Sequence, residues 1–179
     1  MKKTLAFAFA SLFLALLVAA PAAHAQTTDQ SGPTYQAEVY GMVCNQCAYG
    51  VEQALLHTEG VKDAYVNLKD GDVRAFLKSD QTVPVKQIVQ KITDQGISVR
   101  GLQATLSGRV EKQEGTLYFV VGGARYHLRP AEESSSLSQY AGQEVTLSGS
   151  FKDVPGMDGA KDEQPAQFVV EQIATEKTS

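Results

Sequence analysis

Between residues 34 and 102 the hydrophobic pattern switches repeatedly between the period of a strand and the period of a helix. Strand-like stretches precede, separate and follow two helical stretches, and Asp70-Gly71 marks a tight hairpin between the middle pair of strands. The second helical stretch carries apolar residues at i, i+3, i+4 and i+7, namely Val85, Ile88, Val89 and Ile92. This alternation restricts the segment to a small mixed unit with helices packed on a sheet.

The expected elements follow one order along this segment. We expect strands at 35–40, 61–68, 72–78 and 97–102. One helix should begin at Cys47 and end at Gly60, and the other should begin at Pro84 and end at Gly96. The order β-α-β-β-α-β predicts an α+β fold, with a ferredoxin-like domain over residues 34–102. The unit closes on itself, so it is expected to fold and bind its ligand as an isolated fragment. Whether Phe76 or its neighbours face the core stays open.

The remainder of the chain is dominated by strand-like stretches with glycine-rich turns. Strands are expected at 102–110, 116–121, 124–128, 144–151 and 167–173, with a short helix within 131–141. The order β-β-β-α-β-β predicts a small all-β, OB-like barrel domain over residues 103–175. The short joint at 101–103 favours limited motion between the two domains.

Residues 1–25 have the pattern of a secretory signal peptide. Lys2 and Lys3 precede an apolar, uncharged run that is shorter than the roughly 20 residues of a membrane span. Ala23-His24-Ala25 supplies the small residues of a cleavage site, which places the cut before Gln26. A retained membrane anchor is the alternative. The sequence thus predicts a periplasmic or secreted protein with a disordered leader at 26–33.

The charge pattern disfavours nucleic acid and anionic membranes as partners. Cleavage after residue 25 removes two lysines and changes the net charge from −4 to −6. Residues 103–179 hold seven Lys/Arg against eleven Asp/Glu, without a basic run. Tyr118, Phe119 and Tyr126 have the composition of a base-stacking platform, but core packing is the better interpretation in an exported acidic protein.

Two cysteines, Cys44 and Cys47, are the only ones in the chain. A bridge between them closes so short a loop that it adds little stability, so chemistry explains the pair better than stapling does. Two thiolates at a helix amino terminus suit a soft ion, Cu(I) first and Hg(II) next, whereas Zn(II) prefers four ligands. A two-coordinate site also leaves room for a thiolate from a metal-donor or metal-acceptor protein.

The segment Gly41-Met42-x-Cys44-x-x-Cys47 matches the GMxCxxC motif, and residues 34–102 resemble the heavy-metal-associated domain family. That family includes copper chaperones, copper-ATPase modules and a periplasmic mercury-binding protein. The resemblance implies that Cys44 and Cys47 are the metal ligands and that Met42 is a core residue. It also shows a departure, because Ile97 stands where bacterial copper chaperones usually carry tyrosine.

Other interpretations of the cysteine pair remain open. An exported thiol–disulfide oxidoreductase is the main alternative to a non-enzymatic metal carrier, and an inert structural disulfide is another. A further alternative makes the metal domain the sensor of a partner-binding β domain. His57, His127 and Met157 are weaker candidates for ligands, because each is isolated in the sequence.

Overall fold

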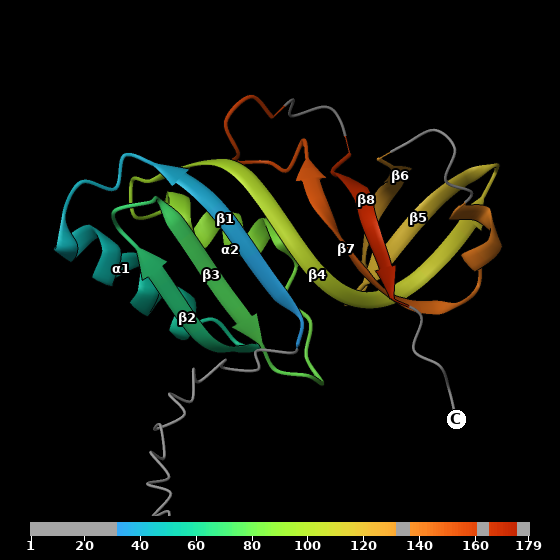
Figure 1. The fold of residues 1–179 in the computed structure, drawn as a ribbon, viewed down its shortest axis with the longest axis horizontal. Coiled ribbons are helices and arrows are strands. Elements are labelled where there is room, and N and C mark those ends of the chain that lie inside the picture. Colours follow the sequence, from blue (N-terminus) through green and yellow to red (C-terminus); the bar gives the residue numbers. More distant parts are fainter. Residues whose placement is uncertain (1–31, 132–136, 161–164, 175–179) are drawn as a thin grey trace, which may run out of the picture.

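A computed structural model describes residues 32–131, 137–160 and 165–174 of the chain (Figure 1). The expected signal peptide and all but the last two residues of the leader lie outside these described residues. The elements are β1 (Thr34–Tyr40), α1 (Asn45–Leu56), β2 (Val61–Asn67), β3 (Asp72–Leu77), α2 (Val85–Thr93), β4 (Ser98–Gln113), β5 (Thr116–Val121), β6 (Ala124–Pro130), the 3-10 helix η1 (Leu137–Tyr140), β7 (Glu144–Lys152) and β8 (Gln167–Ala174). No helix of the described part is long and apolar enough to cross a membrane.

The first four strands form an antiparallel sheet in the order β2-β3-β1-β4, with both helices on one of its faces (Figure 1). This order confirms the ferredoxin-like arrangement. Val73, Ala75 and Leu77 are buried, so the inward face of β3 is settled and Phe76 lies on the opposite face. The four periodic apolar residues of α2 are all buried, as their spacing predicts.

The first helix differs from its expected bounds. It begins at Asn45 and ends at Leu56, four residues before Gly60. The chain leaves the helix because the Thr58 amide donates to the Leu55 carbonyl, which tightens the last turn. The Thr58 hydroxyl also donates to the Ala54 carbonyl at 2.9 Å. Gly60 instead takes a positive φ of 92° in the turn that leads into β2.

Strand β4 joins the two halves of the chain without a break. The expected strands at 97–102 and 102–110 are one strand of 16 residues, so the separation near residue 102 was wrong. The strand pairs with β1 as far as Thr105, and it pairs with β7 from Gln103 onward. These two pairings overlap at residues 103–105, so the pairing passes from β1 to β7 with no gap at which the strand would end.

The strands of the second half are paired in a cyclic order. β4 pairs with β5, β5 with β6, β6 with β8, β8 with β7, and β7 again with β4. The β6–β8 pair is parallel and the other four are antiparallel. The OB-like barrel itself stays a prediction. Of the short helix expected at 131–141, residues 137–140 form η1, and residues 132–136 lie outside the described part.

A shared core crosses the joint between the halves. The Tyr35 hydroxyl, from β1, donates to the Val83 carbonyl at 2.6 Å. The Val85 amide at the start of α2 donates to the Tyr126 hydroxyl of β6 at 3.2 Å. The Phe151 ring of β7 lies 6.2 Å from the Tyr35 ring and 5.0 Å from the Tyr126 ring. Independent folding of residues 34–102 stays a prediction, and such a fragment would lose the contacts made by Tyr126 and Phe151.

These buried tyrosines should make the chain sensitive to alkaline pH. Burial raises the pKa of Tyr35 well above its ordinary range, and burial also raises the pKa of Tyr126. In the unfolded chain both phenols ionise near pH 10, whereas the folded chain keeps them protonated. Their stabilising contribution is therefore full below about pH 10 and is lost as the pH rises towards the folded pKa, by about 1.4 kcal/mol per pH unit for each.

Urea unfolding between about pH 8 and pH 11 measures this loss. Tyr126→Phe should flatten the decline above pH 10, although it removes the hydrogen bond from the Val85 amide and lowers stability near neutral pH. Tyr65→Phe is the control, because Tyr65 is exposed. The same slope in wild type and in Tyr126→Phe would contradict the assignment.

Candidate metal site

The two cysteines lie where β1 ends and α1 begins. Gly41 takes a positive φ of 92°, which lets the chain turn out of the sheet directly after Tyr40. Met42 is buried in the hydrophobic core, whereas the next residue, Val43, is exposed. The buried Met42 side chain anchors the start of the loop, and the residues that follow it, from Val43 onward, lie at the surface. The structure therefore confirms the interpretation of Met42 as a core residue.

Cys44 is the N-cap residue of α1. Its backbone is extended, with φ −144° and ψ 151°, and its carbonyl accepts the amide of Ala48 at 3.1 Å. Its Sγ accepts the backbone N–H of Cys47 at 3.0 Å. A sulfur thus takes the place that a serine or aspartate oxygen usually fills at a helix start. Negative charge on this sulfur is favoured there by the free amides and by the helix dipole.

Cys44 and Cys47 form a disulfide, with their Cα atoms 5.2 Å apart. Both residues are half-buried, and Cys47 packs against the core from the first turn of α1. The structure describes no free cysteine. The fold therefore brings the two sulfurs into direct contact at the surface, and reduction would leave two adjacent thiols at one helix terminus.

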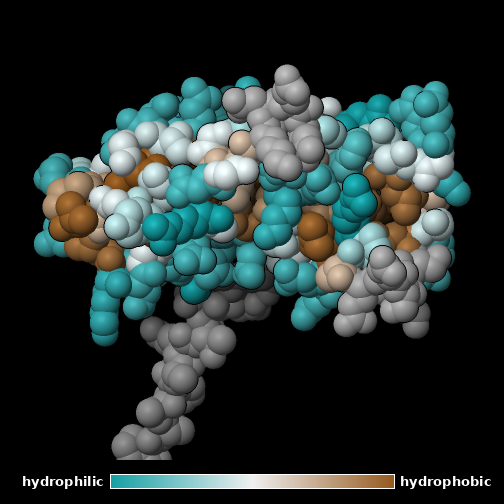
Figure 2. Space-filling view, turned by 90° about the horizontal axis from the view of Figure 1, so that it is seen from above, coloured by the Kyte–Doolittle hydropathy of each residue, from teal (hydrophilic) through white to brown (hydrophobic). Residues whose placement is uncertain are grey.

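Several side chains around the loop are apolar or aromatic. Ile97, just before β4, is 3% exposed and belongs to the core, so it offers neither a hydrogen bond nor a charge to the sulfurs. Tyr40, Val43 and Tyr49 are 61%, 86% and 56% exposed. Figure 2 shows hydrophobic residues gathered at the left end of the molecule, the end that carries the loop before α1 in Figure 1.

Arg100 connects this end of the sheet with the second half of the chain. Its guanidinium lies 3.9 Å from the centre of the Tyr40 ring, and its Nε lies 3.9 Å from a carboxylate oxygen of Asp158. Asp158 is in the loop after β7, and its amide donates to the Val99 carbonyl at 2.8 Å. Sequence reasoning missed this link, because nothing local relates residue 158 to residue 40.

The weaker ligand candidates are not brought to the cysteines. His57 caps the end of α1, where its Nδ1 lies 2.7 Å from the Gln53 carbonyl oxygen. His127 packs edge-on against Tyr118, with ring centres 5.0 Å apart. Met157 packs against the core in the loop after β7. Within the described ranges there is no cluster of three or more His, Cys, Asp or Glu residues that could hold a metal.

Tyr118, Phe119 and Tyr126 do not form one stacking surface. Phe119 and Tyr126 are buried, and only Tyr118 of the three is partly exposed. The Phe119 ring stacks inside the second half against Phe168 at 5.3 Å. Core packing was therefore the correct interpretation of Phe119 and Tyr126, whereas Tyr118 lies partly at the surface.

A helix capped by one cysteine of a CxxC pair, on a βαββαβ sheet, defines a small thiol-bearing module. Residues 38–96 of this chain match the model of the protein family described as "Heavy-metal-associated domain". Over 63 residues the chain is 38% identical to the copper chaperone CopZ of Staphylococcus saprophyticus, which covers 35% of this chain and 91% of that protein. Over 61 residues it is 43% identical to the copper chaperone CopZ of Staphylococcus aureus strain RF122, covering 34% and 88%.

A solved structure titled "CopZ metallochaperone" is 39% identical and covers 37% of this chain and 97% of that one, with a TM-score of 0.35. Through residues 38–96 the chain belongs to the heavy-metal-associated domain family. The match lies within the expected 34–102 and leaves the second half of the chain unrecognised.

Replacing the methionine of the motif tests its role as a packing residue. Met42→Leu conserves volume in the core, so unfolding free energy should change by less than about 1.5 kcal/mol. Copper affinity should stay within about threefold, a change of less than about 1 kcal/mol, because Met42 is buried in the core and is not expected to be a ligand. Competition titration and urea unfolding measure the two quantities, with Met157→Leu as a matched control. A loss of affinity as large as that of a cysteine variant would make Met42 a ligand.

Proposed function

We propose that this chain is an exported, non-enzymatic carrier that captures Cu(I) between the thiolates of Cys44 and Cys47. The observation that carries the proposal is the position of both sulfurs, side by side at the amino terminus of α1. The family match and the copper chaperones among the relatives support copper as the ion. Two soft sulfur ligands satisfy Cu(I), which accepts low coordination numbers.

The site also suits transfer of the ion to another protein. Cys44 and Cys47 are half-buried beside the exposed Val43, so a third thiolate from a donor or acceptor protein can approach. Exchange of ligands then proceeds without release of free copper. Hg(II) fits the same two sulfurs, whereas Zn(II) would need further ligands. Competition titrations of the reduced chain should therefore rank Cu(I) and Hg(II) far above Zn(II).

Metal analysis of protein purified anaerobically from its native compartment tests the proposal most directly. We expect copper in a ratio near one per chain, lost on treatment with a Cu(I) chelator. If the purified protein contains mainly mercury or zinc, that metal and not copper is the cargo. If fully reduced protein contains no metal, the proposal that the chain is a metal carrier is rejected. The same preparation tests export, because cleavage before Gln26 predicts an amino-terminal glutamine in the mature protein.

A thiol–disulfide oxidoreductase is the second candidate, and the disulfide between Cys44 and Cys47 favours it. Such an enzyme would pass this disulfide to a substrate dithiol and would be regenerated by an oxidant. An exchange assay with a reduced peptide substrate separates the two functions. Catalysed exchange together with weak copper binding would favour the enzyme, whereas tight copper binding without turnover favours the carrier.

For residues 103–175 we propose an OB-like barrel that contacts a partner protein. The cyclic order of strand pairs, including the parallel β6–β8 pair, supports this arrangement. The link from Tyr40 through Arg100 to Asp158 supports the variant in which the metal domain is the sensor and this half is the partner-binding module that responds to it. Copper binding should then shift the NMR signals of the loop after β7, and unchanged signals there would reject the sensor.

A further inference from the structure

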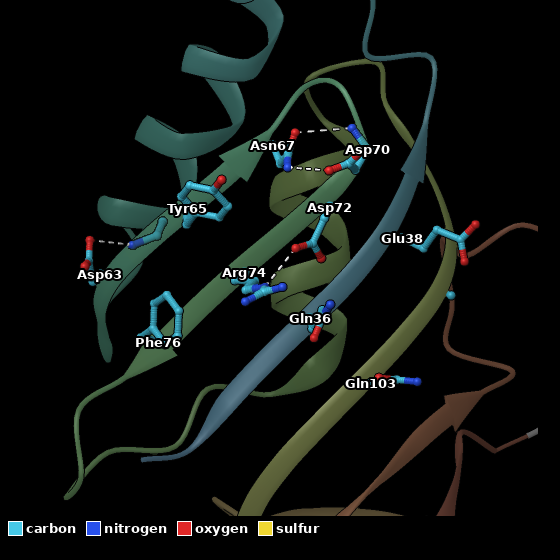
Figure 3. Close-up of a pocket in the computed structure, with 13 residues that line it drawn as sticks. Gln36, Glu38, Asp63, Tyr65, Asn67, Asp70, Asp72, Arg74, Phe76 and Gln103 are labelled. Atoms are coloured by element: carbon cyan, nitrogen blue, oxygen red, sulfur yellow. Dashed lines mark hydrogen bonds and ion pairs between the residues drawn. The ribbon is translucent and has the colours of Figure 1, made fainter. Parts of the chain in front are cut away.

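The open face of the first sheet carries a hollow of about 820 Å³ that is separate from the cysteine loop. It extends over β2, β3, β1 and β4, on the side away from the two helices (Figure 3). Neither Cys44 nor Cys47 lines it. A volume of this size is in the range of binding pockets rather than of packing gaps.

Cross-strand register arranges the lining in rows. Asp72 of β3 lies between Asn67 of β2 and Glu38 of β1, and is the direct register partner of each. One step along the strands, Arg74 lies between Tyr65 and Gln36, and Gln36 in turn pairs with Gln103 of β4. Figure 3 shows the side chains of these rows on the near side of the strands, with the helices behind.

The lining of the hollow carries more negative charge than its own cation neutralises. Glu38, Asp63, Asp70 and Asp72 line the hollow, and Arg74 is the one cation among the lining residues. Arg74 is already engaged, since its Nε donates to Asp72 at 2.8 Å. Glu38 is the register partner of Asp72, but its carboxylate is turned toward Gly101, away from Arg74, the one cation of the lining (Figure 3). Positive charge from outside the chain would pair with it.

The second row, together with Phe76 two positions beyond Arg74 on β3, gives the hollow an aromatic and an amide character. Tyr65 is 50% exposed, and Phe76 is half-buried beside it on the same open face. Aromatic rings of this kind pack against the methylene stems of lysine and arginine and attract their charges. The side-chain amides of Gln36 and Gln103 offer donors and acceptors that suit a peptide backbone.

We propose that this hollow binds an extended, lysine- or arginine-bearing peptide segment of a partner protein. Four strands spaced about 4.8 Å apart are crossed by roughly five extended residues, so a short segment spans the hollow. Its cations meet Glu38 and Asp70, and the methylene stems of its lysine or arginine side chains lie on Tyr65 and Phe76. Because the surface is separate from the cysteines, the segment binds whether or not copper is present.

The test uses the mature chain and a fluorescein-labelled peptide of about eight residues that alternates lysine and alanine. Fluorescence anisotropy should show saturable binding that added salt weakens. The variant Glu38→Gln/Asp70→Asn should raise Kd about fivefold or more, because two partly exposed charge pairs are lost. The variant Glu114→Gln/Glu144→Gln removes the same net charge from the second half and should change Kd less than about twofold.

NMR of the wild-type chain with saturating peptide gives the location. Shifts should concentrate at Tyr65, Asp72 and Glu38 and should persist in a chain that lacks both cysteines. An equal loss of peptide affinity in the two double variants would overturn the proposal, because the binding would then depend only on the net charge of the chain. Absence of saturable binding, or shifts centred elsewhere on the molecule, would overturn it as well.

Discussion

Cys44→Ser and Cys47→Ser should each abolish tight copper binding by the reduced mature chain while leaving its fold intact. Cu(I) prefers soft sulfur, and a serine hydroxyl does not replace a thiolate as its ligand. We therefore expect a loss well beyond the roughly 10- to 100-fold that removal of an outer hydrogen-bond partner of a metal ligand costs. The stoichiometry should fall from one Cu(I) per chain to none.

Folding should survive these changes for two physical reasons. The disulfide spans only three positions, so its loss removes little chain entropy from the unfolded state. Serine is also a good N-cap residue, so Cys44→Ser keeps an acceptor for the Cys47 amide. Circular dichroism checks the fold, and competition against a Cu(I) chelator measures affinity. Wild-type affinity in either variant would remove that cysteine from the site.

Local signals in the sequence were sufficient for the elements that carry this site. The helical repeat of α2 needs no tertiary information, because four apolar residues at helical spacing specify one buried face. Strand β5 has the bounds that the turn glycines on either side of it predict. The change from strand to helix at the CxxC likewise placed the cysteines at the start of α1.

The continuity of β4 was beyond those signals. Glycine is common between secondary-structure elements, so Gly101 suggested a connection between two strands, and the patterns on its two sides were interpreted as separate elements. In the structure a register shift between Glu38 and Val39 absorbs the irregularity opposite Gly101, and pairing continues on both sides. That outcome depends on where β1 and β7 lie, which only tertiary packing decides.

The redox state of the cysteines and the polar hollow were also not predicted. A CxxC sequence is the same whether its thiols are free or joined, because the surrounding redox conditions decide the state. The hollow arises from four strands brought together, and its Glu38–Asp72 pair is visible only once the register is known. Alternation of polar residues along β1 and β3 was the available signal.

Oxidation should block copper capture completely and reversibly. The disulfide between Cys44 and Cys47 has no thiolate to offer, and only thiolates bind the ion. Reduction by a dithiol transfers two electrons and two protons to the bridge, gives two thiols, and leaves the reductant as a disulfide. Copper binding then displaces protons from both sulfurs, so affinity in the reduced state should also fall as the pH is lowered.

The measurement compares oxidised and reduced mature chain, each challenged with Cu(I) under anaerobic conditions without added reductant. The oxidised form should take up none, and the same sample should bind one Cu(I) per chain after reduction and removal of the reductant. Bound copper should in turn protect both thiols from alkylation. The double variant Cys44→Ser/Cys47→Ser is the control and should bind none in either condition. Equal uptake by the oxidised and reduced wild type would place the metal away from Cys44 and Cys47.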